Sequence, residues 1–128
     1  MKAIVVFCNV RDEGKGHPFA WLLKDNFKHC FVAFLTEVGW VEIDYRMGIP
    51  LVRCMAPPEF DINKYYEDNG FITVRTKQPR NMRFRFNPFR GNIMVANCVG
   101  LVKALLGIKS FAITPYQLYK NLIWYHCR

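Results

Sequence analysis

The chain has 128 residues, a formal net charge of +8, and 52% hydrophobic and 16% aromatic residues. This apolar content excludes an intrinsically disordered chain, and the length favours a single domain over residues 1–128. No apolar run approaches the ~18 residues needed to cross a bilayer, so we expect no membrane span. The apolar stretch Ala3–Cys8 is short and soon followed by charged residues, so it indicates a strand and not a signal peptide.

The first half of the chain is typical of a sheet. Met1–Val10 predicts a first strand, and Phe19–Asp25 a short helix. His29–Leu35 is almost wholly apolar, whereas Gly39–Tyr45 alternates, and the short connector between them predicts a hairpin. Ile49–Met55 predicts the next strand.

The second half adds helices to this sheet. We expect a polar helix over Asp61–Asp68 and a strand over Phe71–Thr76. A buried helix should begin at Cys98, capped by Asn97, and end at Gly107. A last helix should cover Pro115–Trp124, with Thr114 as N-cap and three side chains facing inward: Leu118, Leu122 and Ile123. The predicted fold is α+β, a mostly antiparallel sheet of about five strands with the Cys98 helix packed on it.

The five cysteines stand at positions 8, 30, 54, 98 and 127. They form no CxxC pair and no cluster with histidine at metal-ligand spacing, so we expect no metal and no cofactor. Reduced thiols in a cytoplasmic chain are the simplest interpretation. Cys98 differs from the others because free N–H groups and the helix dipole at a helix start favour the thiolate. The alternative is that Cys98 only fills space in the core.

A reactive cysteine needs a base and a group that orients the base. His29 opens the first strand of the hairpin, beside the end of the second, so Asp44 is its predicted partner and Glu42 the fallback. His17 is an alternative base, and Asp44 could instead pair with Arg46. Cys98, His29 and Asp44 are thus the candidate nucleophile, base and orienting acid.

Oxyanion stabilisation would come from the backbone N–H of Cys98. No second donor can be identified from the sequence, although the indole N–H of Trp21 is a candidate.

The order of these residues resembles permuted papain-like peptidases, the NlpC-type amidases in circularly permuted form, akin to the lecithin:retinol acyltransferase-like group. That group carries an Asn-Cys pair at its nucleophile helix, as at Asn97-Cys98 here. The stretches HCFVAFLTEVGWVEID and NCVGLVKALLGIKSFAITPYQLYKNL are also similar to small cysteine peptidases encoded by tailed phages. The likeness covers roughly residues 27–46 and 92–122, and departs from the acyltransferase-like group at Gly100. It implies the same three roles for Cys98, His29 and Asp44.

Together these features predict a phage-encoded hydrolase of amide or peptide bonds, located in the host cytoplasm or the virion. The expected substrate is a peptide, an isopeptide or a peptidoglycan stem peptide, and the sequence does not separate hydrolysis from acyl transfer. Other virion proteins are candidate partners.

A basic block, Arg75–Arg90, carries six cations without an acid between them, interleaved with phenylalanines: Arg75, Lys77, Arg80, Arg83, Arg85 and Arg90, with Phe84, Phe86 and Phe89. Such a pattern suits single-stranded nucleic acid, or it is simply a solvated face. The alternative function is therefore a non-enzymatic, basic virion or nucleic-acid-associated protein on the same fold.

Overall fold

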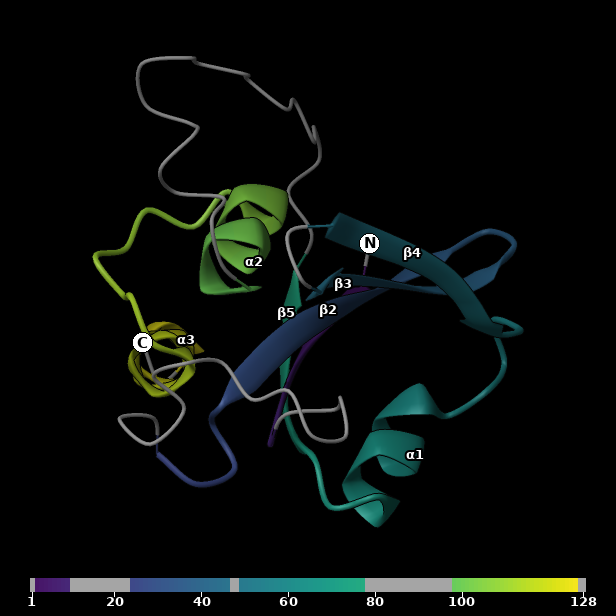
Figure 1. The fold of residues 1–128 in the computed structure, drawn as a ribbon. Helices are drawn as coiled ribbons and strands as arrows, with labels where there is room; N and C mark the ends of the chain where they lie inside the picture. Colours follow the sequence, from purple (N-terminus) through teal and green to yellow (C-terminus); the bar gives the residue numbers. More distant parts are fainter. Residues whose placement is uncertain (1, 10–23, 47–48, 78–97, 127–128) are drawn as a thin grey trace.

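The computed structural model describes residues 2–9, 24–46, 49–77 and 98–126. Its centre is a five-stranded sheet in the order β4-β3-β2-β1-β5, in which every neighbouring pair is antiparallel (Figure 1). The strands are β1 (Lys2–Cys8), β2 (His29–Thr36), β3 (Gly39–Arg46), β4 (Ile49–Ala56) and β5 (Ile72–Lys77). The helices are α1 (Ile62–Asp68), α2 (Cys98–Leu106) and α3 (Pro115–His126).

Helices cover both faces of the sheet. Helices α2 and α3 pack on one face and α1 on the other (Figure 1). Strand β2 is the central strand and β1 lies beside it, and both are covered by helices on their two faces, which explains their continuous apolar sequences. In β1 the alternation sends Val5 and Phe7 towards α2 and α3, and Ile4 and Val6 towards α1. The sheet thus holds two separate cores, one under each helical layer.

The β2–β3 hairpin depends on one glycine. The Thr36 hydroxyl donates to the carbonyl of Gly39 over 2.7 Å, and Gly39 has a φ of +143°. A Cβ atom at this position would stand 2.4 Å from the carbonyl oxygen of Ala56 on β4. Only glycine therefore fits both the backbone angle and the close approach of the neighbouring strand.

Helix α2 ends as its sequence predicts. Gly107 has a φ of +64°, and its N–H donates to the carbonyl of Ala104 over 3.4 Å. The N–H of Ile108 donates to the carbonyl of Lys103 over 2.9 Å. These two bonds form a Schellman motif, which satisfies carbonyls that the last turn of the helix leaves without partners.

Helix α3 begins with a reciprocal cap. The N–H of Gln117 donates to the Thr114 hydroxyl, and the Gln117 side chain accepts from the N–H of Thr114. Leu118 and Leu122 are buried as predicted. The prediction for Ile123 is wrong, because this side chain is 37% exposed. Leu118 and Leu122 are four residues apart and share one face, whereas the next residue is turned about 100° away from it.

The α+β class, the five-stranded antiparallel sheet and the hairpin are confirmed. The cap at Asn97, most of the predicted helix Phe19–Asp25 and the basic block beyond Lys77 fall outside the described residues. Of the helices that the structure describes, none is both long and apolar enough to cross a membrane.

The hairpin glycine gives a first prediction. Gly39→Ala should lower the free energy of unfolding by about 2 kcal/mol or more, since it adds both a positive-φ penalty and a clash with Ala56. Gly70→Ala is the matched control: Gly70 has a φ of +80° but open space around it, so only the backbone penalty applies. Urea denaturation of both variants measures the difference. Equal losses would show that the contact with Ala56 is unimportant.

Candidate active site

His29 and Asp44 meet where β2 and β3 separate. The paired ladder between these strands runs from Thr36 and Gly39 to Val32 and Ile43. Continuing this register sets Asp44 across from Phe31, so His29 is its diagonal neighbour, within reach of a long side chain. The side chains form a bond across this gap: His29 Nε2 lies 2.6 Å from Asp44 Oδ1.

The carboxylate of Asp44 is completely buried and both of its oxygens are used. Oδ1 accepts from His29, and Oδ2 accepts from Arg46 Nε over 3.0 Å. Burial alone would raise the pKa of Asp44, but the hydrogen bonds and charges of His29 and Arg46 outweigh it and lower the pKa. Asp44 is therefore ionised at neutral pH. The predicted alternatives, pairing with His29 or with Arg46, both occur.

Glu42, the fallback partner of His29, is engaged elsewhere. Its Oε2 accepts from the Tyr66 hydroxyl of α1 over 2.8 Å, and its Oε1 accepts from Arg53 of β4 over 3.0 Å. Glu42 is buried and ties the sheet to α1. Of the two acids considered, Asp44 is the one that binds His29.

Cys98 begins α2 and lies over the start of β2. Hydrogen bonding with the Cys30 side chain lowers the pKa of its thiol most; burial opposes this, and the hydrogen bond and charge of His29 lower it further. The net pKa lies well below the ordinary value, and the start of the helix favours a thiolate in the same direction. Cys98 is only partly exposed.

The pKa of His29 is shifted the opposite way. Burial lowers it, but hydrogen bonds and charge interactions with Asp44 and Cys98 outweigh burial and raise the pKa to about 9. These opposite shifts favour a Cys98 thiolate beside a His29 imidazolium at neutral pH. Because Nε2 is occupied by Asp44, Nδ1 is the ring nitrogen that can exchange a proton with the sulfur.

Cys30 is the residue of this site that the sequence interpretation missed. Its thiol is fully buried, and burial raises its pKa well above the ordinary value, so it stays protonated and can donate to Cys98. Alternation in β2 sends Cys30 to the face that α2 covers. This alternation, read together with the predicted helix start at Cys98, was the signal that could have found it.

His17 and Trp21, the alternative base and the second oxyanion donor, lie outside the described residues. Over residues 2–9, 24–46, 49–77 and 98–126, no three side chains of His, Cys, Asp or Glu gather in a group that could hold a metal ion. The site as described consists of Cys98, His29 and Asp44, with Cys30 and Arg46 in support.

Comparison with known proteins adds no relative: no family model matches the chain, and no curated protein or solved structure shows significant similarity to it.

The Asp44 bond gives a second prediction. In Asp44→Asn, the pKa of His29 should fall below 9, because an anionic acceptor is replaced by a neutral amide while burial still disfavours the imidazolium. A pH titration of the His29 ring resonances by NMR measures this pKa. As a control, Glu42→Gln replaces a buried carboxylate that is bonded to Tyr66 and Arg53, and it should leave the titration of His29 near pH 9. An unchanged midpoint in Asp44→Asn would contradict the account.

The Cys30 thiol gives a third prediction. Cys30→Ala removes a donor to the Cys98 sulfur, so the pKa of Cys98 should rise and its alkylation should weaken as the pH is lowered below 7. The rate of iodoacetamide modification at Cys98, followed by mass spectrometry from pH 5 to 9, measures the shift. Cys54→Ala is the control, since Cys54 is exposed on β4. Superimposable profiles for Cys30→Ala and wild type would count against this role for Cys30.

Proposed function

We propose that the protein is a cysteine-nucleophile hydrolase of an amide or peptide bond, related to the permuted papain-like, NlpC-type enzymes. The observation that carries the proposal is the linked set of a helix-start thiol, a histidine and a buried carboxylate that holds the histidine over 2.6 Å. Asp44, ionised and itself held by Arg46, fixes the ring orientation and favours its protonated form. An α+β sheet with the thiol-bearing helix packed on it also agrees with this kind of enzyme.

In the proposed acylation step, the Cys98 thiolate attacks the carbonyl carbon of the substrate, and the carbonyl oxygen becomes an oxyanion. The backbone N–H of Cys98, at the first residue of α2, would donate to this oxyanion. The C–N bond then breaks, and His29 gives its proton to the leaving amine. The product is a thioester on Cys98.

In the second step, His29 removes a proton from water, and the resulting hydroxide attacks the thioester carbon. The C–S bond breaks, the acid is released, and Cys98 leaves as the thiolate beside a protonated His29. An amine in place of water would complete an acyl transfer by the same steps. Peptides, isopeptides and peptidoglycan stem peptides are the substrates we propose, with action in a phage-infected cell or in a virion.

A fourth prediction tests this function. Cys98→Ala should lower hydrolysis of a stem-peptide or synthetic peptide-amide substrate by about a thousandfold or more, because the covalent route is lost. Loss of acyl-enzyme in an intact-mass measurement, with an unchanged circular dichroism spectrum, separates chemistry from folding. Cys54→Ala, which also replaces a thiol, should retain full activity. Equal hydrolysis by wild type and Cys98→Ala would refute the proposal.

A second proposal, a basic nucleic-acid-associated or structural virion protein, is favoured by the exposed side chains of Arg75 and Lys77 on β5. These two residues open the basic block and lie on an edge strand of the sheet. Salt-sensitive retention on single-stranded DNA by the Cys98→Ala variant would support this function independently of catalysis.

A further inference from the structure

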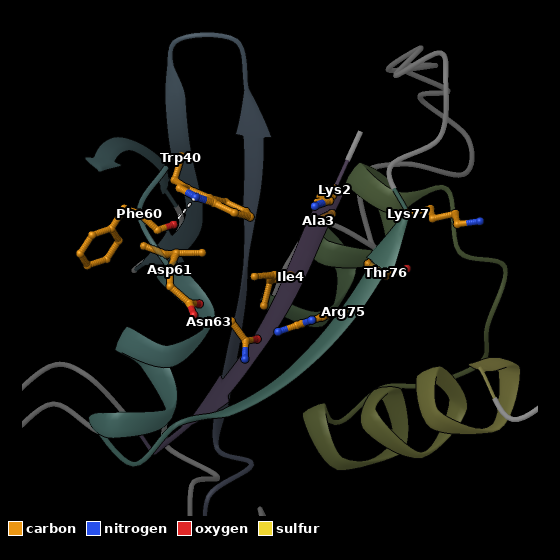
Figure 2. A pocket seen from close by; sticks show the side chains of 11 residues that line it. Lys2, Ala3, Ile4, Trp40, Phe60, Asp61, Asn63, Arg75, Thr76 and Lys77 are labelled. Carbon is orange, nitrogen blue, oxygen red and sulfur yellow. Dashed lines mark hydrogen bonds between the residues drawn. The ribbon is translucent and has the colours of Figure 1, made fainter. Parts of the chain in front are cut away.

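A cavity of about 440 Å³ opens between β1, β5 and the segment that leads into α1 (Figure 2). It lies away from Cys98: Ile4 lines it, while His29 pairs with Cys8, four residues further along β1, or about 13 Å. Its volume suits one small molecule. Its walls have three different features, and each of them would bind a different chemical group of a ligand.

The first feature is an unpartnered acceptor. Asn63 on α1 is 9% exposed, and its Oδ1 finds no hydrogen-bond partner among the residues that the structure describes. Its orientation is fixed, because Nδ2 donates to Glu67 Oε1 over 2.7 Å, and a flipped amide would place two oxygens together. Asn63 lines the cavity, and its Oδ1 is turned away from Glu67 (Figure 2). A ligand with an N–H or O–H group would satisfy it.

The second feature is a set of like charges on one face of two strands. Lys2 of β1 is directly paired with Lys77 of β5, and Arg75 is paired with Ile4. Directly opposed cations repel one another. No ion pair to these three cations exists within the described parts of the chain, and the one carboxylate in the lining, Asp61, leaves two positive charges in excess. An anion with a double charge would relieve this repulsion.

The third feature is an apolar wall formed by Trp40 and Ile4. The Trp40 ring is held by a bond from its Nε1 to the carbonyl of Phe60 over 3.0 Å, and it borders the cavity with Ile4 (Figure 2). Both side chains are almost fully buried. A flat, largely apolar ring would cover this wall.

We infer that this cavity binds a nucleotide, with the base against Trp40 and Ile4 and a base N–H donating to Asn63. The phosphate lies on Lys2 and Arg75, and Lys77 turns towards it from the outward position that Figure 2 shows. A phosphate monoester supplies close to two negative charges, and a base supplies both the flat ring and the donor. A single carboxylate would leave a cation in excess, and a bare phosphate would leave Asn63 without a partner. The site does not involve Cys98, so it goes beyond the proposed hydrolase.

A fifth prediction tests the site by NMR titration of the ¹⁵N-labelled chain with four nucleoside 5′-monophosphates. At least one should give saturable shifts at the Trp40 indole and at Ile4 and Arg75. The matching nucleoside, ribose 5-phosphate and inorganic phosphate should each bind at least tenfold more weakly. Equal binding of inorganic phosphate, or shifts spread over basic residues without saturation, would overturn the inference.

Variants assign the interactions. Arg75→Ala and Asn63→Leu should each weaken nucleotide binding about tenfold or more. Lys109→Ala, which removes the same charge from an exposed connector, and Cys98→Ala should bind as wild type. Because Arg75 is exposed, its variant is expected to fold even if Asn63→Leu does not. Unchanged binding in Arg75→Ala would overturn the inference.

A short single-stranded oligonucleotide, added to the nucleotide complex, identifies the source of the ligand. If the oligonucleotide displaces the mononucleotide, the cavity accepts a nucleotide that is part of a strand. If the mononucleotide stays bound, the cavity is a site for the free mononucleotide. Failure of both probes to bind would refute the proposal.

Discussion

The bond between His29 and Asp44 is the interaction on which the candidate site depends. A completely buried carboxylate is unfavourable unless it is paired, and here one oxygen accepts from His29 and the other from Arg46. The charge on Asp44 helps to keep a proton on His29, and the charge on His29 lowers the pKa of Cys98. Asp44 therefore favours the thiolate form of Cys98 indirectly, through its effect on His29.

The fold supplies this arrangement from two distant segments. The hairpin fixes His29 and Asp44 relative to each other, and Gly39 allows the tight turn that sets their register. Helix α2 then brings Cys98 over the start of β2, where buried Cys30 provides a further donor. On the other face of the sheet, α1 carries Asn63 to the separate cavity. One sheet therefore carries the candidate active site and a separate cavity, and the two share no residue.

Much of this could be predicted from the sequence because the signals are local. Each of these signals involves only a few neighbouring residues: the alternation in Gly39–Tyr45, the apolar run after His29, and the cap residues Thr114 and Gly107. The strands and helix ends that they predict are present in the structure. The sequence predicts Asp44 as the acid that binds His29, with Glu42 as the fallback, because it does not fix the strand register to better than a residue or two. The 2.6 Å bond from His29 to Asp44 decides between them, and Glu42 binds Tyr66 and Arg53 instead.

Other features required the three-dimensional arrangement. Cys30 belongs to the site only because α2 packs on its side of β2, and no local pattern states where a helix will pack. The exposure of Ile123 depends on which stripe of α3 meets the sheet. The cavity at Asn63 is lined by β1 and β5, the first and last strands along the chain, and by α1. Its cations Lys2 and Lys77 become neighbours only because β1 pairs with β5 in this register.

The central claim is that Cys98 and His29 form a thiolate–imidazolium pair at neutral pH. Ultraviolet absorbance of the thiolate, recorded from pH 4 to 10 as the difference between wild type and Cys98→Ser, measures this pair directly. The account predicts a thiolate signal already present at pH 7, which is reduced in His29→Ala because the cation beside the sulfur is lost. A signal that appears only near pH 8.5, the value of an ordinary thiol, and is unaffected by His29→Ala would contradict it.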